Sequence, residues 1–382
     1  MSEQDADFFS AFAIPWTPEP WDRIYSRETK KGPVARKVVS DDTNDPHFRR
    51  DWLNWSWEDF DFVIVEFSGG KDSVAMVLFL LDAGCPREKI ELWHEDVDGG
   101  VPFMDWPVTA AYVRAFAAYF KLPLLTHERR GGLRGEMLKN NVPSQPIIIE
   151  IPSRTGPKKV ELTAPAAVGT RMMWPSKGKL ETRWCSGYIK IDVARRVFTT
   201  DPRFTRTKGE RPPRILHLSG ERRAESTNRT TYAQVEGDSV SGVTVRFCVR
   251  WRPILHLKHH EVWDLMKKHH VQPHPAYEMG FGRCSCFGCI YNEAEEWATM
   301  ADIAPERFAA ISAMERRLKH TVTDKMSVVE QAALGESMAT PAAKAKWADI
   351  AMGRRPFTTE MIYRKNWVIP PGHLRGNKGG GE

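Results

Sequence analysis

From Asp61 onward, short apolar blocks of strand-like composition alternate with longer blocks of helix-like pattern. Blocks rich in Val, Ile and aromatic residues predict strands, and longer apolar runs bounded by turn residues predict helices. The alternation predicts a βαβαβ beginning, whose blocks are DFVIVEF, DSVAMVLFLLDAG, KIELWHEDVD, VTAAYVRAFAAYFKLP and PLLTHE. Because parallel neighbours need crossover helices, we expect an α/β fold with a doubly wound, mostly parallel sheet.

The alternation of strand and helix blocks ends after residue 128, and the segments nearer the C-terminus predict mainly helices. Residues 129–213 form a long insertion with basic loops and one expected strand, PIIIEI. Strands are expected again in RILHLSG and VTVRFCVRWRPIL, and a helix in KHHEVWDLMKKHH. NEAEEWATM and PERFAAISAMERRLKH predict two further helices, the second with Pro305 in its first turn and Phe308, Ile311 and Leu318 on one face.

Three regions follow from these patterns. Residues 1–55 are rich in Pro, Trp and charge without a sustained period, and predict an irregular N-terminal arm or cap. Residues 56–300 predict the sheet domain, including a cysteine-rich loop. Residues 301–382 predict a helical C-terminal extension, and we expect its end, HLRGNKGGGE, to be disordered.

Composition narrows the class of protein. A chain of 382 residues that is 41% hydrophobic describes a soluble globular protein with a large core. No apolar run reaches the roughly 18 residues of a membrane span, and the start MSEQDADFFS is acidic where a secretory signal is basic. We therefore expect a cytoplasmic protein without a membrane partner. The net charge of +6 permits a polyanion partner and equally fits an ordinary basic surface.

The segment SGGKDS joins the first expected strand to the first expected helix. In a doubly wound sheet this joint faces the ligand crevice, and the helix directs its unpaired N–H groups there. Gly69 and Gly70 let the backbone approach closely, Lys71 adds a cation, and Ser68 and Ser73 add hydroxyl donors. Asp72 is expected to cap the helix or to hold Mg²⁺. The segment predicts a site for the phosphates of ATP, while a Walker A motif is absent from the sequence.

SGGKDS resembles the pyrophosphatase loop of the adenine nucleotide alpha hydrolase-like superfamily, whose members cut ATP between its α- and β-phosphates. Three further segments resemble the phosphoadenosine phosphosulfate (PAPS) reductase family, in the order that this family has them. They are TRWCSGYIKID, LSGERRAESTNR with Gly220, Arg222, Glu225, Ser226 and Arg229 of the G-x-R-x-x-E-S-x-x-R element, and the stretch RPILHLKHHEVWDLMKKHHVQPHPAYEMGFGRCSCFGC. The resemblance covers about residues 60–300 and implies the corresponding fold.

The resemblance also implies roles for single residues. Arg222, Arg229 and Lys71 are expected to be catalytic, because positioned cations neutralise the charge that develops when the α-phosphorus is attacked. Asp96 and Asp98, at the end of the second expected strand, are expected to meet the sugar or base of the nucleotide, with a solvated strand end as the alternative. Gly220, Glu225 and Ser226 are expected to complete the nucleotide site.

Six cysteines are too few for a disulfide scaffold in a chain of this length. Cys284, Cys286 and Cys289 share one short loop, and the resemblance brings Cys185 near them. Four thiolates can hold a 4Fe-4S cluster or a tetrahedral zinc ion, and the cluster-bearing members of the family favour the cluster. This chain has Trp184 where those members carry a second upstream cysteine, so the ligand set stays open. Cys85 and Cys248 are expected to pack as small hydrophobes.

No cysteine follows Cys289, whereas the reductases of this family use a nucleophilic cysteine near their C-terminus. The resemblance therefore favours the sulfur-transfer component of DNA phosphorothioation systems of the Dnd or Ssp type. It implies an ATP pyrophosphatase and sulfurtransferase, with a cysteine desulfurase or other sulfur donor and further subunits of a modification complex as partners. The alternatives are a PAPS or adenylyl-sulfate reductase, and a non-catalytic nucleotide-sensing protein of a phage or defence system.

Basic loops give permissive support for a DNA partner, since phosphate backbones are bound by Lys and Arg. A solvated face is the equally open alternative. The residues concerned are Arg129, Arg130, Arg134, Arg154, Lys158, Lys159, Arg203, Arg206, Lys208 and Arg211.

Overall fold

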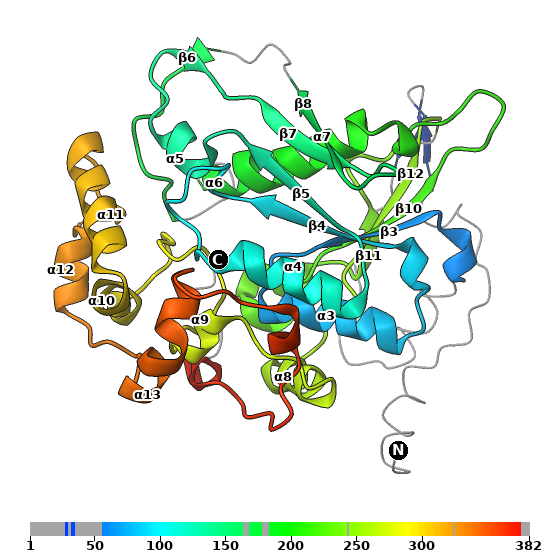
Figure 1. Ribbon diagram of the computed structural model, residues 1–382. Coiled ribbons are helices and arrows are strands. Elements are labelled where there is room, and N and C mark those ends of the chain that lie inside the picture. Colours follow the sequence, from blue (N-terminus) through cyan, green and yellow to red (C-terminus); the bar gives the residue numbers. More distant parts are fainter. Residues whose placement is uncertain are drawn as a thin grey trace. The chain divides into compact units, whose positions relative to one another are not determined.

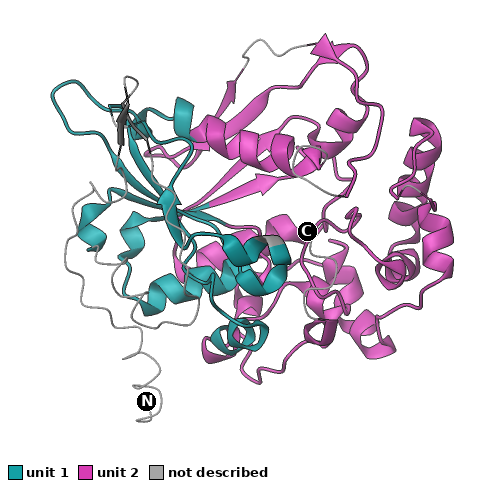
Figure 2. Cartoon of the chain, turned by 180° about the vertical axis from the view of Figure 1, so that it is seen from behind, with its two compact units in different colours: residues 1–66, 72–92, 198–265 teal, residues 67–71, 93–197, 266–382 magenta. Residues whose placement is uncertain are grey.

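The computed structural model describes residues 27–29, 32–34, 56–162, 168–177, 183–242, 244–323 and 325–375. Most of the expected N-terminal arm and residues 376–382 of the expected disordered tail therefore lie outside the described residues. Within the arm, β1 (Arg27–Thr29) pairs antiparallel with β2 (Gly32–Val34). The chain forms two compact units, drawn in teal and magenta in Figure 2. Unit 1 comprises residues 1–66, 72–92 and 198–265, and unit 2 comprises 67–71, 93–197 and 266–382. The boundaries predicted at residues 55 and 300 stay predictions.

Unit 1 holds β3 (Phe62–Glu66), β10 (Arg214–Leu218), β11 (Val235–Gly237) and β12 (Phe247–Trp251). β10 pairs parallel with both β3 and β12, and β11 is antiparallel to β12 at the edge. Val63, Ile64 and Val65 are fully buried in succession, as expected for a parallel strand covered on both faces. Helical elements of this unit are α3 (Lys71–Asp82, whose first residue is in unit 2), η2 (Trp57–Asp59), η3 (Arg87–Lys89), η5 (Pro202–Phe204), η6 (Arg223–Glu225) and η7 (Thr227–Thr231).

Strand β4 (Ile90–Asp96) begins in unit 1 and ends in unit 2. Unit 2 continues with β5 (Leu124–Arg129), β7 (Ile147–Ile151) and β8 (Lys158–Leu162), whose pairings β5–β7 and β7–β8 are antiparallel. The strand order is β11-β12-β10-β3-β4-β5-β7-β8, and β6 (Val142–Pro143) pairs with β9 (Val168–Gly169) in a separate sheet. In Figure 1, α4 (Thr109–Phe120) and α7 (Asp192–Thr200) lie on opposite faces of β5. The predicted α/β fold with a doubly wound, mostly parallel sheet is confirmed.

Helices dominate the C-terminal region, as predicted. They are α8 (His259–Lys268), α9 (Pro275–Glu278), α10 (Ala294–Ile303), α11 (Pro305–Leu318), α12 (Val328–Ala333), α13 (Pro341–Ala343), η8 (Lys344–Ala348), α14 (Asp349–Ala351), η9 (Thr359–Ile362) and η10 (Pro371–Arg375). Pro305 occupies the first turn of α11, where its missing N–H costs no hydrogen bond. Ile311 and Leu318 are buried, whereas Phe308 is only half-buried.

The insertion has more structure than the sequence predicted. The expected strand PIIIEI is β7, and β8 pairs with it along five residues. Helix α5 (Gly132–Met137) precedes it, and α6 (Trp184–Ser186), a π-helical turn η4 (Gly187–Ile191) and α7 follow. The sequence analysis predicted no element for the residues of these last three. No described helix is long and apolar enough to cross a membrane.

Candidate functional site

The phosphate loop predicted at SGGKDS contains one position that only glycine fits. Gly69 has a φ of 77°, and a Cβ atom there would lie 3.0 Å from Val113 Cγ1 and 3.1 Å from Tyr112 Cδ1. Both the left-handed backbone and the packing against α4 therefore require glycine. At Gly70 a Cβ atom would meet its neighbours at an ordinary 3.5 Å, and the Gly70 N–H faces Ser68 Oγ at 3.4 Å.

A tyrosine that the sequence analysis did not single out ties this loop to the cysteine loop. The Tyr277 hydroxyl, on α9, accepts hydrogen bonds from the backbone N–H of Lys71 at 2.8 Å and of Cys284 at 3.2 Å. Tyr277 and Lys71 are each 1% exposed. The shared acceptor fixes the first residue of α3 and the first cysteine of CSCFGC to one atom within unit 2. In the sequence, Tyr277 was visible only as the Y of the family stretch.

The loop passes into unit 1 between Lys71 and Asp72. There, a Cβ atom on Gly220 would lie 3.4 Å from the carbonyl of Asp72 and from the nitrogen of Ser73. Arg222 is fully buried and donates through Nε to Asp72 Oδ1 at 2.6 Å and through Nη1 to the Leu257 carbonyl at 3.3 Å. The structure thus brings Gly220 and Arg222 to the start of α3, with Arg222 orienting the Asp72 carboxylate.

The remainder of the 220–229 motif forms its own network in unit 1. Glu225 Oε2 accepts from the Arg222 N–H at 3.0 Å and forms an ion pair with Arg229. Ser226 Oγ is buried and has no hydrogen-bond partner in the described part of the chain. A buried hydroxyl without a protein partner suits a polar ligand. Arg222 and Arg229 both bind carboxylates here, so their roles at phosphate stay predictions.

The carboxylates of Asp96 and Asp98 accept hydrogen bonds from different parts of the backbone. Asp96 Oδ1 accepts from the Asp98 N–H at 2.8 Å and closes the turn after β4. Asp98 is buried, and its two carboxylate oxygens accept from the backbone N–H groups of residues 103–105, at 2.7 Å for Met104. The solvated strand end is therefore wrong for Asp98, because its carboxylate is used to shape the following loop. Contact of either residue with a nucleotide stays a prediction.

The four predicted thiols lie in unit 2, where Lys190 and Asp105 face them. Burial and, beyond it, the charge of Cys289 raise the pKa of Cys185. Burial lowers the pKa of Lys190, but Cys286, Asp105 and Cys185 raise it more, so the net shift is upward and the side chain stays an ammonium. Burial and the Asp98 carboxylate raise the pKa of Asp105 to about 7. The sequence analysis included Lys190 in the W-C-x-x-x-x-K-I segment but assigned it no function. Asp105 belongs to none of the motifs that the sequence analysis found.

A cation stack supports the segment that carries Cys185 and Lys190. The Arg171 guanidinium lies 4.4 Å from the ring centre of Trp184 and 4.1 Å from that of Tyr188, and its Nε is 3.1 Å from Glu136 Oε2. The π-helical turn Gly187–Ile191 contains Lys190 and begins two residues after Cys185, and such turns are frequent at functional sites. Trp184, which replaces the second upstream cysteine of the family, thus has a packing role.

The four thiols are a donor set that an iron–sulfur cluster or a tetrahedral zinc ion can take. Tetrahedral zinc holds its thiolates about 3.8 Å apart, because Zn–S bonds are about 2.3 Å long. Among the residues that the structure describes, no three of these four sulfur atoms lie within 4.8 Å of one another. The Lys190 ammonium would offset the charge of thiolates held by either group. Cys85 and Cys248 are buried in unit 1, as expected for small hydrophobes.

Several residues of the basic loops are bound to acidic partners. The pairs are Arg129–Asp192 at 2.7 Å, Arg130–Glu161 at 2.5 Å, Arg203–Glu91 at 2.8 Å and Arg211–Asp61 at 2.7 Å. By contrast Arg154, Lys158, Lys159 and Lys208 are exposed. Internal pairing reduces the number of charges that a phosphate backbone can meet.

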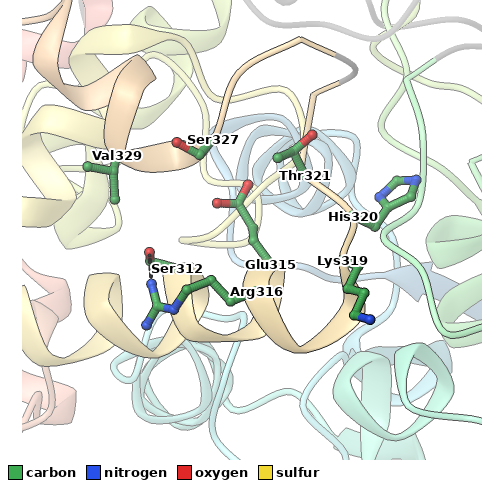
Figure 3. A pocket seen from close by; sticks show the side chains of 8 residues that line it. All are labelled: Ser312, Glu315, Arg316, Lys319, His320, Thr321, Ser327 and Val329. Atoms are coloured by element: carbon green, nitrogen blue, oxygen red, sulfur yellow. Dashed lines mark hydrogen bonds between the residues drawn. The ribbon is translucent and has the colours of Figure 1, made fainter.

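A separate hollow of about 610 Å³ lies on the C-terminal helices (Figure 3). Arg316 Nη1 donates to Ser312 Oγ at 2.8 Å there, and Glu315 accepts from the N–H groups of Val322 and Val328. Arg316 and Glu315 are therefore already hydrogen-bonded, and none of the lining residues belongs to the predicted site. The lining residues are Ser312, Glu315, Arg316, Lys319, His320, Thr321, Ser327 and Val329.

Comparison with known proteins supports the resemblance seen in the sequence. Residues 175–292 match the phosphoadenosine phosphosulfate reductase domain family, which confirms the predicted resemblance over that segment. The segment contains Cys185, the 220–229 motif and CSCFGC, but not the loop SGGKDS. The match supports a nucleotide-binding domain of the PAPS reductase type.

Two kinds of relatives were found. An uncharacterized 37.8 kDa protein of Escherichia phage 186, from the gpa 5′ region, is 26% identical over 274 residues, which are 66% of this chain and 74% of that protein. Among solved structures, the FMN adenylyltransferase of Candida glabrata with FAD and inorganic pyrophosphate has a TM-score of 0.32 and 11% identity, and its complex with FMN and an ATP analogue has 0.30 and 14%. Both alignments cover 63% of this chain and 58% of the enzyme, which is less than two thirds of its length.

Proposed function

We propose that this protein is an ATP pyrophosphatase that adenylates an acceptor oxygen and supports sulfur transfer to nucleic acid, in a reaction of the DNA phosphorothioation type. The observation that carries the proposal is the Tyr277 hydroxyl, which accepts from the N–H of Lys71 and of Cys284. It joins a loop suited to nucleotide phosphates to a loop of thiols, and sulfur transfer driven by ATP needs both at one place.

In the proposed reaction, a phosphate oxygen of the acceptor attacks the α-phosphorus of ATP. A new P–O bond forms, the bond between the α- and β-phosphates breaks, and pyrophosphate leaves. Hydrosulfide then attacks the activated acceptor phosphorus, forms a P–S bond and displaces AMP. Sulfur keeps its oxidation level in this step, whereas a persulfide donor requires two further electrons.

The residues of the loop would stabilise the charge of these steps. The Lys71 ammonium would face the phosphate oxygens at the start of α3, where the helix dipole favours anions. Asp72 is the proposed ligand of the Mg²⁺ that accompanies ATP, and Arg222 orients its carboxylate. Cys185, Cys284, Cys286 and Cys289 are the thiols available to a 4Fe-4S cluster, which when bound would supply electrons for handling sulfur.

The test is a product assay with anaerobically purified protein, ATP, Mg²⁺, hydrosulfide and DNA. We expect AMP and pyrophosphate in equal amounts, together with phosphorothioate in the digested DNA, measured by mass spectrometry. Lys71→Met keeps the aliphatic volume and removes the charge, so product formation should fall by at least about a hundredfold. Lys267→Ala, on the exposed face of α8, is the matched control and should leave the rate unchanged.

The domain match also favours a second candidate, reduction of PAPS or adenylyl sulfate. This candidate predicts sulfite release with thioredoxin and no need for DNA, and such activity would overturn the proposal. ATP binding without any product under either set of conditions would instead favour a nucleotide-sensing protein, for which the phage relative gives a context.

A further inference from the structure

The hollow on the C-terminal helices (Figure 3) is bordered by segments that hydrogen bonds hold together. Glu315, which is buried on α11, accepts from the N–H groups of Val322 at 2.8 Å and of Val328 at 3.0 Å, and so ties the connection to α12 back onto α11. The side-chain amide of Gln331, on α12, donates to Thr323 Oγ1 at 3.3 Å. The volume of about 610 Å³ is therefore preformed, as small-molecule sites usually are.

Two exposed cations, Arg316 and Lys319, line the hollow. Among the residues that the structure describes, neither of them forms an ion pair. Arg316 donates through Nη1 to Ser312 Oγ at 2.8 Å, and its guanidinium has further N–H donors. Glu315 supplies the one carboxylate among the lining residues, and both of its oxygens accept from backbone N–H groups. The charge that the hollow offers to a ligand is therefore positive.

Cations at the C-terminus of a helix often serve only to balance the helix dipole. The last carbonyl groups of α11, however, already have backbone partners. The Lys319 N–H donates to the Arg316 carbonyl at 3.3 Å, and the His320 N–H donates to the Glu315 carbonyl at 3.2 Å. In addition, His320 lines the hollow, and its Nδ1 is buried without a hydrogen-bond partner in the described part of the chain. A buried ring nitrogen without a protein partner suits a polar ligand.

We propose that the hollow is a second ligand site, which binds a small molecule through a phosphate group held by Arg316 and Lys319. Guanidinium and ammonium groups are common phosphate-binding side chains, and the bond to Ser312 already fixes the guanidinium. The volume exceeds that of a phosphate and lies in the range of about 300–1,000 Å³ of small-molecule sites. Val329, 50% exposed on α12, adds an apolar surface across from Ser312 (Figure 3). The proposal does not depend on the proposed function, because its residues lie outside the predicted ATP site.

Calorimetry on the full chain, with AMP and inorganic phosphate as probes, is the first measurement. Every chain carries Lys71→Met, so that the predicted phosphate loop contributes little. We expect AMP to bind, inorganic phosphate to compete with it, and adenosine, which lacks the phosphate, not to compete. Arg316→Gln with Lys319→Gln should weaken AMP binding at least about tenfold, because both cations are lost. Arg317→Gln with Lys365→Gln removes the same charge from exposed residues outside the hollow, and this matched control should leave AMP binding unchanged.

The NMR signals of the His320 ring, as the second measurement, show where the probe binds. Inorganic phosphate should shift these signals in the Lys71→Met chain and leave them in place when Arg316 and Lys319 are also replaced. Equal AMP affinity in the Arg316 and Lys319 variant and in its control overturns the proposal, as does the absence of binding of either probe at millimolar concentration. If that variant loses affinity for a DNA duplex but not for AMP, the two cations belong to a nucleic-acid surface, and the proposal is likewise overturned.

Discussion

Gly69 is the residue at which the phosphate loop depends most directly on backbone conformation. Its φ of 77° strains any other residue, and a Cβ atom there would press on Val113 at 3.0 Å. We expect Gly69→Ala to lower the free energy of unfolding by about 1–3 kcal/mol and to weaken ATP binding, because the loop must leave its left-handed conformation. Gly70→Ala is the matched control for stability, since its Cβ has ordinary 3.5 Å contacts. Urea unfolding and calorimetry check both, and equal stability of the two variants would contradict the steric argument.

Removing the hydroxyl oxygen of Tyr277 tests the link between the phosphate loop SGGKDS and the cysteine loop CSCFGC. Tyr277→Phe takes the shared acceptor away from the N–H groups of Lys71 and Cys284. We expect a loss of about 1–3 kcal/mol in stability and a weaker affinity for ATP. Tyr112→Phe is the matched control, because its hydroxyl donates at 2.9 Å to the Gln272 carbonyl, away from the loop. The idea fails if both variants bind ATP equally well.

At the scale of elements, a buried charge network joins three strands of unit 1. His217, on β10, lies 2.7 Å from Glu66 Oε1 at the end of β3 and 2.8 Å from Asp238 Oδ2. Arg250, on β12, also binds Asp238, at 2.8 Å. Burial lowers the pKa of His217, but the bonds to Asp238 and Glu66 raise it more, and the net pKa is above the ordinary 6.5.

This network predicts how stability depends on pH. Because the pKa of His217 is higher in the folded state, its contribution is fully present below about pH 6.5 and is lost as pH rises through the folded value. We therefore expect the stability gap between the unsubstituted chain and His217→Gln to be largest at pH 6 and to shrink toward pH 9. His260→Gln, on the exposed face of α8, is the control. Urea unfolding at several pH values measures the gap, and a gap that widens toward pH 9 would reverse the assigned sign.

The sequence predicted the elements whose hydrophobic residues repeat with a clear helix or strand period. It did not predict elements whose conformation depends on contacts with residues distant in the sequence. β3, β4 and α4 form within the predicted blocks, and α3 and β5 each extend one residue beyond theirs. The π-helical turn at Gly187–Ile191 escaped prediction because packing of Arg171 between Trp184 and Tyr188 supports it, and no local pattern announces that contact. For the candidate site, motifs singled out the glycines and the thiols. The contact between Arg222 and Asp72 joins residues 150 positions apart, and that between Tyr277 and Lys71 joins residues 206 positions apart.

At the scale of the whole molecule, the net charge of +6 does not show which basic residues already form ion pairs within the protein. Arg129, Arg130 and Arg211 of the predicted basic loops bind Asp192, Glu161 and Asp61. In contrast, Arg154, Lys158 and Lys159 are exposed at the turn between β7 and β8 and at the start of β8. If DNA is the acceptor, this hairpin is the better candidate for contact with its phosphates.

The hairpin can be tested through the salt dependence of binding. Each phosphate contact contributes about 0.9 to the slope of log K against log salt for duplex DNA, so the triple change Arg154→Ala, Lys158→Ala, Lys159→Ala should reduce the slope by up to about 3. The control, Arg130→Ala with Arg211→Ala, also removes cations, but from residues that already have carboxylate partners, and should change the slope less. Fluorescence anisotropy with a labelled duplex at several salt concentrations measures both. A larger effect in the control would place the DNA contact on the paired arginines, whose carboxylates would then have to be displaced on binding.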